Sequence, residues 1–228
     1  MAAKPSAKKR KPIGANETFW GYLFLLPVII GFIVFTIFPV AMSFYYSLTD
    51  YDGVTSPKFI GLQNYIDLFS NGDFGEALWH TIYFTIGTVP LGTLLAILVA
   101  VLLNQKIRGL NFYKSSFFIP VIVSYTSIAM VWQWLYNDDF GLINSALNTL
   151  GLPSVPWLTS SAWAMPSVII MSIWKNLGFN SVILLAGVQG VSPAVYEAAD
   201  IDGANVVQKF FRITLPMLKP TIMFVMII

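Results

Sequence analysis

Residue types that commonly carry out chemistry are sparse in this chain. It has no cysteine and a single histidine, His80, which excludes thiolate chemistry and argues against a histidine-based metal centre. Asp138 and Asp139 are adjacent, but neighbouring carboxylates repel each other and no partner acid, base or third ligand stands near them in the sequence, so a solvated loop is the simpler interpretation. The phosphate-binding patterns GxxxxGKS and GxxxxGKT are missing, so we do not expect the chain to bind ATP itself. The sequence predicts no enzyme, no metal site and no cofactor.

One charged residue stands in an unusual place. Lys175 lies inside a long apolar run, and a charge within a membrane span costs about 2.5–3.5 kcal/mol on insertion scales. Its ammonium either faces a cavity, where it contacts a solute or stabilises one conformation, or pairs with backbone carbonyls or a second subunit, and we favour the pairing. With Asn180 it makes up the candidate translocation path, although hydrogen bonds between helices also explain the polar residues of this run.

The elements that must position these residues are membrane helices. Hydrophobic residues make up 56% of the 228 residues and charged residues only 11%, against roughly 25% in an ordinary soluble domain. A helix needs about 20 apolar residues to cross a bilayer. We therefore expect an all-α polytopic bundle with four full spans, at residues 19–46, 77–103, 112–136 and 162–189. A fifth apolar run begins near Met217 and stops at Ile228, so we also expect the chain to be truncated within that span.

Charge predicts the orientation of these spans. Residues 1–18 carry five basic residues against one acid, and residues 104–114 carry three basic residues and no acid. The segment 47–76 carries five acids against Lys58, and residues 137–161 carry two acids and no base. The positive-inside rule then places the N-terminus, residues 104–114 and residues 190–220 in the cytoplasm. The basic N-terminal cluster is a topology signal and not a nucleic-acid site.

These patterns predict the organisation of the chain. The first apolar run is too long for a signal peptide, so we expect an uncleaved first span. The expected parts are a basic cytoplasmic tail (1–18), a first transmembrane helix (19–46), an external loop (47–76) and a core (77–228) with a functional loop at 191–220. Trp132, Trp134 and Tyr136 stand at a predicted outer boundary, which is typical of an aromatic belt.

The loop from 191 to 220 has the features of a helical hairpin. Ser192-Pro193 is a helix start, and Gly203 suits the end of that helix. A second short helix is expected over 204–212, and Leu215-Pro216 is expected to turn the chain back to the bilayer. Ala199 and Gly203 are four residues apart and share one face, with Ala198 beside them. Such a smooth face lets another protein approach closely, or it lets the hairpin rest on its own bundle.

This loop resembles the EAA loop of binding-protein-dependent ABC permeases. The family pattern is EAA, three variable residues, G, about nine residues, and then I-x-LP. Glu197-Ala198-Ala199, Gly203 and Ile213-Thr214-Leu215-Pro216 match it in order and spacing. The features that resemble the carbohydrate-uptake permeases cover nearly the whole chain: Asp202-Gly203-Ala204, Pro220, Leu26-Pro27, Phe38-Pro39, the segment 59–65 and the segment 174–189.

The resemblance implies a fold, a location and a set of roles. It implies a bundle of the type I ABC importer permease type in the cytoplasmic membrane of a bacterium or archaeon. The loop would dock in a groove on an ATPase subunit, where Glu197 would make polar contacts. The resemblance implies that Ala198, Ala199 and Gly203 would permit close approach, that Leu215 and Pro216 would fix the loop to the fifth span, and that Asp202 belongs to the same coupling set.

The resemblance also implies partners: a second permease subunit, two cytoplasmic ATPase subunits, an external substrate-binding protein and membrane lipid, with no nucleic acid. The implied solute is a sugar or a related molecule. Two alternatives stay open, a permease of this class for a non-sugar solute and a self-sufficient carrier or channel. The carrier would need several ionisable groups inside the membrane, and within its apolar runs the sequence offers Lys175 alone.

Overall fold

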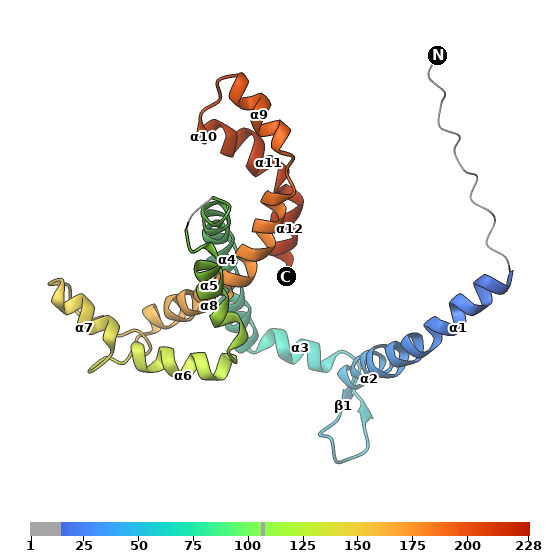
Figure 1. Ribbon diagram of the computed structural model, residues 1–228. Helices are drawn as coiled ribbons and strands as arrows, with labels where there is room; N and C mark the ends of the chain where they lie inside the picture. The colour runs from blue at the N-terminus through green and yellow to red at the C-terminus, as the bar shows by residue number, and fades with distance from the viewer. Residues whose placement is uncertain (1–14, 106–107) are drawn as a thin grey trace. The chain divides into compact units, whose positions relative to one another are not determined.

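The computed structural model describes residues 15–105 and 108–228, and nearly all of its regular structure is helical (Figure 1). Three helical stretches are long and apolar enough to span a membrane, Thr18–Ser47, Gly72–Leu103 and Ser161–Gln189, and each of two bent helix pairs adds one more if it is counted as a span. The expected all-helical membrane bundle is therefore confirmed. Residues 1–14 of the predicted basic tail lie outside the described residues.

The chain divides into two compact units, one ending at Glu76 and the other beginning at Ala77. The first unit opens with α1 (Ala15–Phe32), a π-helical segment (Ile33–Ile37) and α2 (Phe38–Ser47), which form one continuous span. The wide turn ends two residues before Pro39. Because proline lacks an N–H and its ring crowds the carbonyl four residues earlier, a π turn lets the helix continue past it.

A short structured segment follows the first span. Strand β1 (Thr49–Asp50) pairs antiparallel with β2 (Lys58–Phe59), with Thr49 opposite Phe59. This hairpin is the departure from the all-α expectation in the described part of the chain. Helix α3 (Gln63–Ser70) comes next and is separated by one residue from α4 (Gly72–Leu103).

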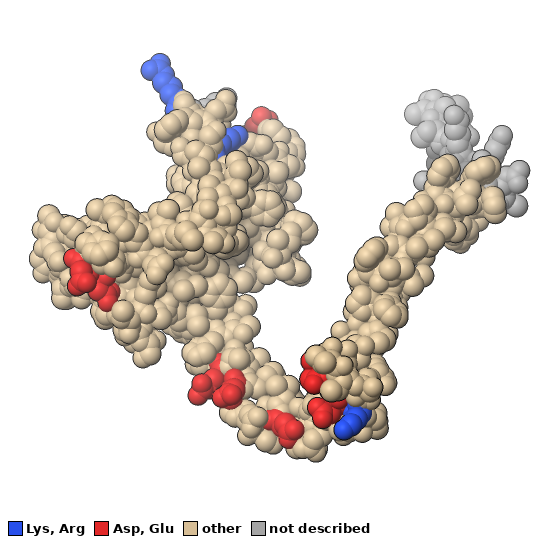
Figure 2. All heavy atoms as spheres, turned by 90° about the horizontal axis from the view of Figure 1, so that it is seen from below, with Lys and Arg blue, Asp and Glu red and all other residues tan. Residues whose placement is uncertain are grey.

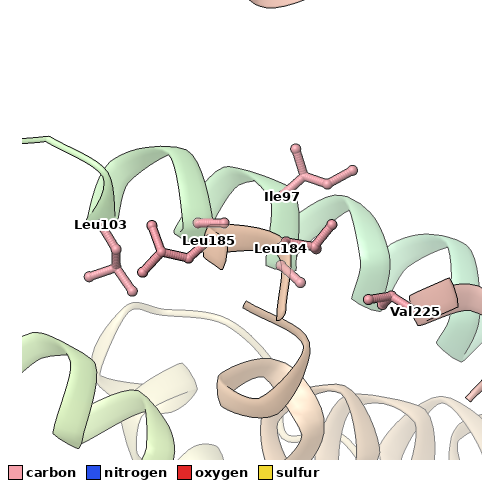
Figure 3. Packing of buried hydrophobic residues seen from close by; sticks show 7 residues of the cluster. Ile97, Leu103, Leu184, Leu185 and Val225 are labelled. Atoms are coloured by element: carbon pink, nitrogen blue, oxygen red, sulfur yellow. The ribbon is translucent and has the colours of Figure 1, made fainter. Parts of the chain in front are cut away.

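The second unit is organised around α8 (Ser161–Gln189). It packs against α5 (Leu110–Ile122) and α12 (Lys219–Ile227). Figure 3 shows the apolar cluster where Ile97 and Leu103 of α4 meet Leu184 and Leu185 of α8 and Val225 of α12. Small residues allow this close approach, because Ala96 and Ala100 of α4 are completely buried in the same cluster.

The third apolar run differs from its expected form. Residues 112–136 were predicted as one span, but α5 ends at Ile122 and α6 (Tyr125–Leu135) leaves it at an angle of 102°. The 13 residues of α5 extend only about 20 Å, short of the ~30 Å hydrocarbon core. Pro120 removes one helical hydrogen bond, and the Ser124 hydroxyl accepts from the Ser127 N–H, starting a new helix.

Aromatic rings hold α6 in its bent position. Trp132 lies 5.5 Å from Trp174 of α8 and 5.1 Å from Tyr136, measured between ring centroids. Tyr136 stacks on Trp157 at 5.2 Å, and its hydroxyl donates to the Ser167 carbonyl at 3.0 Å. Tyr136 is only 3% exposed, so it packs inside the protein, whereas Trp134 of the predicted aromatic belt is exposed.

The last apolar run also bends, and not at the expected place. The chain stays helical through α10 (Val206–Lys209), a π segment (Phe210–Thr214) and α11 (Leu215–Met217), and then bends by 61° before α12. The π segment ends two residues before Pro216, just as the π segment of the first span ends two residues before Pro39. It lets the helix continue past the proline. The turn predicted at Leu215-Pro216 therefore falls at Leu218, just before Pro220.

We predict that Gly178→Ala destabilises the contact between α5 and α8. A Cβ atom at Gly178 would lie 1.9 Å from the Phe117 carbonyl oxygen, so the two helices must separate. Overpacking of this kind costs about 1–3 kcal/mol. A lower midpoint of thermal unfolding in detergent is the expected result.

Gly31→Ala is the matched control, because a Cβ there meets nothing within 4 Å and the position is helical. It should leave the midpoint unchanged or raise it slightly. Equal midpoints for the two variants would contradict the packing described here.

Candidate functional site

The loop that carries the sequence motif forms a compact helical hairpin. Helix α9 (Pro193–Ile201) ends where Gly203 adopts a φ of +74°. The Ala204 N–H donates to the Ala199 carbonyl at 2.9 Å, and the Gly203 N–H donates to Asp200 at 3.1 Å. These two bonds make a Schellman motif, which requires a left-handed residue and so explains the glycine.

The second arm of the hairpin begins with a capping box. The Asn205 side chain accepts from the Gln208 N–H at 2.8 Å, and the Gln208 side chain accepts from the Asn205 N–H at 2.9 Å. An ion pair between Asp200 and Lys209 links the two arms. The hairpin, defined here as residues 192–217, is therefore held together by its own hydrogen bonds and ion pair.

One residue joins the hairpin to the bundle, and another contact closes its inner side. The Tyr196 hydroxyl lies 2.9 Å from the hydroxyl of Thr214, which is 6% exposed, so these two arms of the hairpin meet. Leu215 is partly buried and packs against the core cluster shared by α4, α8 and α12. Leu215 is therefore a point of contact between the hairpin and the core.

The predicted coupling residues fall on two sides of the hairpin. Glu197, Ala198, Asp202 and Gly203 are exposed, and so is Pro216. Ala199 is 7% exposed and faces its own unit. The spacing of the small residues had suggested one shared outer face. The structure differs, because Ala199 contributes to the packing of the hairpin itself.

Sequence reasoning missed a set of exposed apolar residues on the hairpin. Ile201 is 87% exposed, and three more large side chains, Val206, Val207 and Phe211, are more than half exposed. A signal existed in the sequence, since Ile201 is an apolar residue between two aspartates on a short helix. Apolar side chains rimmed by charge are typical of a protein contact surface.

The buried ammonium group of Lys175 is hydrogen-bonded to the end of the broken helix. Its Nζ donates to the carbonyls of Pro120 at 3.0 Å, Val121 at 3.3 Å and Val123 at 3.0 Å. It also lies 4.5 Å from the centroid of the Tyr125 ring. The last carbonyls of a helix have no partner in the helix, and a cation is favoured at that end. Lys175, only 4% exposed, therefore caps α5 where the third run breaks.

The other polar residues near Lys175 point along a different side of α8. Asn180 is five residues further on, so the two candidates for a translocation path do not share a helical face. Asn176 and Asn180 do share one, and the Asn176 amide donates to the Tyr125 hydroxyl at 3.0 Å. Both asparagines are partly exposed, unlike Lys175.

No group of three or more metal-ligating side chains occurs among the residues that the structure describes. The Asp138 carboxylate, one of the adjacent pair considered above, accepts from the Thr159 hydroxyl at 2.6 Å. That contact joins two parts of a loop and assembles no reactive group.

Several apolar helices of spanning length, together with a helical hairpin near the end of the chain, are the architecture of a polytopic membrane protein. The chain belongs to the family of the binding-protein-dependent transport system inner membrane component, whose model matches residues 69–228. Members of this family are transport proteins and not enzymes.

Named relatives of the chain are sugar permeases. It is 35% identical to the trehalose/maltose transport system permease protein MalF of Thermococcus litoralis, over 93% of this chain and 72% of that protein. It is 35% identical to the arabinooligosaccharides transport system permease protein AraP of Bacillus subtilis, over 98% of this chain and 72% of that one. A chain of a bacterial alginate ABC transporter, solved with its pentasaccharide-bound periplasmic protein, matches with a TM-score of 0.78 and 28% identity, over 91% of this chain and 69% of that chain.

We predict that Lys175→Met destabilises the protein. It leaves the carbonyls at the end of α5 without a donor, which costs about 1–3 kcal/mol. Lys175→Arg keeps the charge and donors at this position and should lose less. The measurement is thermal unfolding in detergent, together with the KM for transport.

The two roles considered for Lys175 give different results in this experiment. A capping role lowers stability and leaves the KM of the folded fraction unchanged. Contact with the solute would raise the KM at unchanged stability, and that outcome would contradict the capping role.

Proposed function

We propose that this chain is the transmembrane permease subunit of an ATP-driven importer that receives a sugar or related solute from an external binding protein. It works with a second permease subunit and with two cytoplasmic ATPase subunits. The named relatives support the solute class, because they transport maltose, trehalose and arabinooligosaccharides. The observation that carries the coupling role is the hairpin at residues 192–217, which folds on its own contacts and leaves Glu197, Ala198 and Gly203 exposed.

The exposed side of the hairpin is suited to a groove on an ATPase subunit. Ala198 and Gly203 let a partner approach the backbone, and Glu197 and Asp202 supply acceptors for hydrogen bonds at the rim. We add Ile201 to the coupling set, because an apolar side chain that is 87% exposed gains the most from being covered. Leu215 and Pro216 connect this surface to the last spans.

The hairpin can transmit a displacement because it is stiff. The Schellman motif, the capping box and the Asp200–Lys209 ion pair hold its arms together. The Tyr196–Thr214 hydrogen bond also links the two arms, and the packing of Leu215 joins the hairpin to the core. When ATP closes the ATPase pair, the hairpin moves as one body and the attached spans change their packing.

The orientation belongs to the same proposal. The N-terminus, residues 104–114 and the hairpin lie on the cytoplasmic side, where ATP is available. The alternation of basic and acidic loops supports this arrangement. Figure 2 shows acidic side chains gathered along the segment after the first span, which carries Asp50, Asp52, Asp67, Asp73 and Glu76.

Two alternatives are weaker than this proposal. A permease for a non-sugar solute has the same hairpin, but the named relatives favour carbohydrate. A self-sufficient carrier needs ionisable groups that are free to bind and release ions within the membrane. Lys175 does not meet this need, because three carbonyls already surround its ammonium group.

We predict that Gly203→Asp uncouples the permease from its ATPase. A charged side chain at the docked backbone should lower binding-protein-stimulated ATP hydrolysis about tenfold, which corresponds to ~1.4 kcal/mol. The measurement is hydrolysis by the purified complex in proteoliposomes, with and without the binding protein and its sugar. Co-purification of the ATPase subunits is scored on the same samples.

Gly151→Asp is a closely matched control. Gly151 has a φ of +76°, a Cβ there meets nothing within 4 Å, and it ends α7 (Leu142–Thr149) in the same Schellman motif, with Leu152 N–H donating to Leu147. The backbone strain of the two variants is therefore equal, and only Gly203 lies in the hairpin. Equal hydrolysis and equal ATPase recovery in both variants would disprove the coupling role.

A further inference from the structure

Helix α3 in the segment between the first two spans is amphipathic. Leu62, Ile66 and Phe69, at spacings of four and three residues, fall on one helical face and are 64%, 57% and 72% exposed. Gln63 and Asp67 lie about 100° around the helix from Leu62 and Ile66, and the Gln63 amide donates to the Asp67 carboxylate at 2.8 Å. The first unit therefore leaves a row of large apolar side chains uncovered.

Hydrogen bonds tie the start of α3 to the end of the first span. The Asn64 amide donates to the carbonyls of Ser47 at 3.0 Å and Thr49 at 2.9 Å. The Tyr65 hydroxyl lies 2.7 Å from the Ser47 hydroxyl. Ser47 is the last residue of the apolar helical stretch Thr18–Ser47, so α3 begins beside the end of the first span.

The end of α3 is followed closely by α4. Asn71 alone separates the two helices, and the rings of Phe69 and Phe74 meet edge to face at 5.2 Å. The last charged residue before the apolar part of α4 is Glu76.

We infer that α3 is an interfacial helix that lies along the membrane surface, with Leu62, Ile66 and Phe69 buried at the boundary between headgroups and acyl chains. The occupant of this face is the lipid surface, because the start of the helix is hydrogen-bonded to the residues that end the first apolar stretch. The polar face with Gln63 and Asp67 then faces the aqueous side. The inference does not depend on the proposed coupling role.

The charge of this segment indicates which force binds the helix to lipid. The surrounding side chains are mainly acidic, so anionic headgroups repel the segment and do not attract it (Figure 2). Apolar burial must therefore carry the contact.

The absence of cysteine makes a direct test possible. Single cysteines replace Ile66 or Phe69 on the apolar face, and Gln63 or Asp67 on the polar face, and each carries a nitroxide spin label. The permease, purified with its associated subunits, is placed in bilayer discs of phosphatidylethanolamine and phosphatidylglycerol. Collision rates are then measured with oxygen, which concentrates in lipid, and with a water-soluble nickel chelate.

The inference predicts opposite results on the two faces. Labels at Ile66→Cys and Phe69→Cys should collide with oxygen and lose collisions with nickel, whereas labels at Gln63→Cys and Asp67→Cys should collide mainly with nickel. Nickel access on both faces would show that α3 stands in water and would overturn the inference. Loss of both collision rates at Phe69→Cys, or such a loss only after the binding protein is added, would show a protein contact and would overturn it equally.

Discussion

Every part of this protein depends on the rule that backbone polar groups must find partners where water is absent. Most do so within helices, and the break between α5 and α6 is the place where the rule is hardest to meet. There the Lys175 ammonium supplies donors to the carbonyls of Pro120, Val121 and Val123. A buried ammonium without partners and a helix end with unpaired carbonyls would each cost free energy. Here they pair with each other, so α6 can leave α5 at an angle of 102°.

The absence of water also determines how the rest of the core packs. In lipid there is little hydrophobic drive between helices, so close packing of small residues has to hold them. Gly178 against the Phe117 carbonyl and Ala96 and Ala100 of α4 in the core cluster fill this need. Wide π turns precede two of the prolines, Pro39 and Pro216, while Pro220 follows a bend.

The hairpin at residues 192–217 closes its backbone mainly with local hydrogen bonds. Its Schellman motif and capping box close its backbone without help, so its outer surface is free for a partner. Two proposals concern segments that connect the spans. The hairpin is proposed to pass a displacement to the spans, and α3 is proposed to lie on the lipid surface.

The sequence by itself determined the class of protein, the positions of the apolar runs and the place of the functional loop. The length of an apolar run and the fixed spacing from Glu197 to Pro216 are local properties. They can therefore be read directly from the order of the residues. Only the tertiary structure decided that residues 112–136 break in two, because the donor that permits the break comes from more than 50 residues away. It also decided that Ala199 turns inward while Ile201 turns outward, and that the apolar side of α3 lies open. A sequence gives the period of a helix, but the face that is covered depends on which neighbours the fold brings to it.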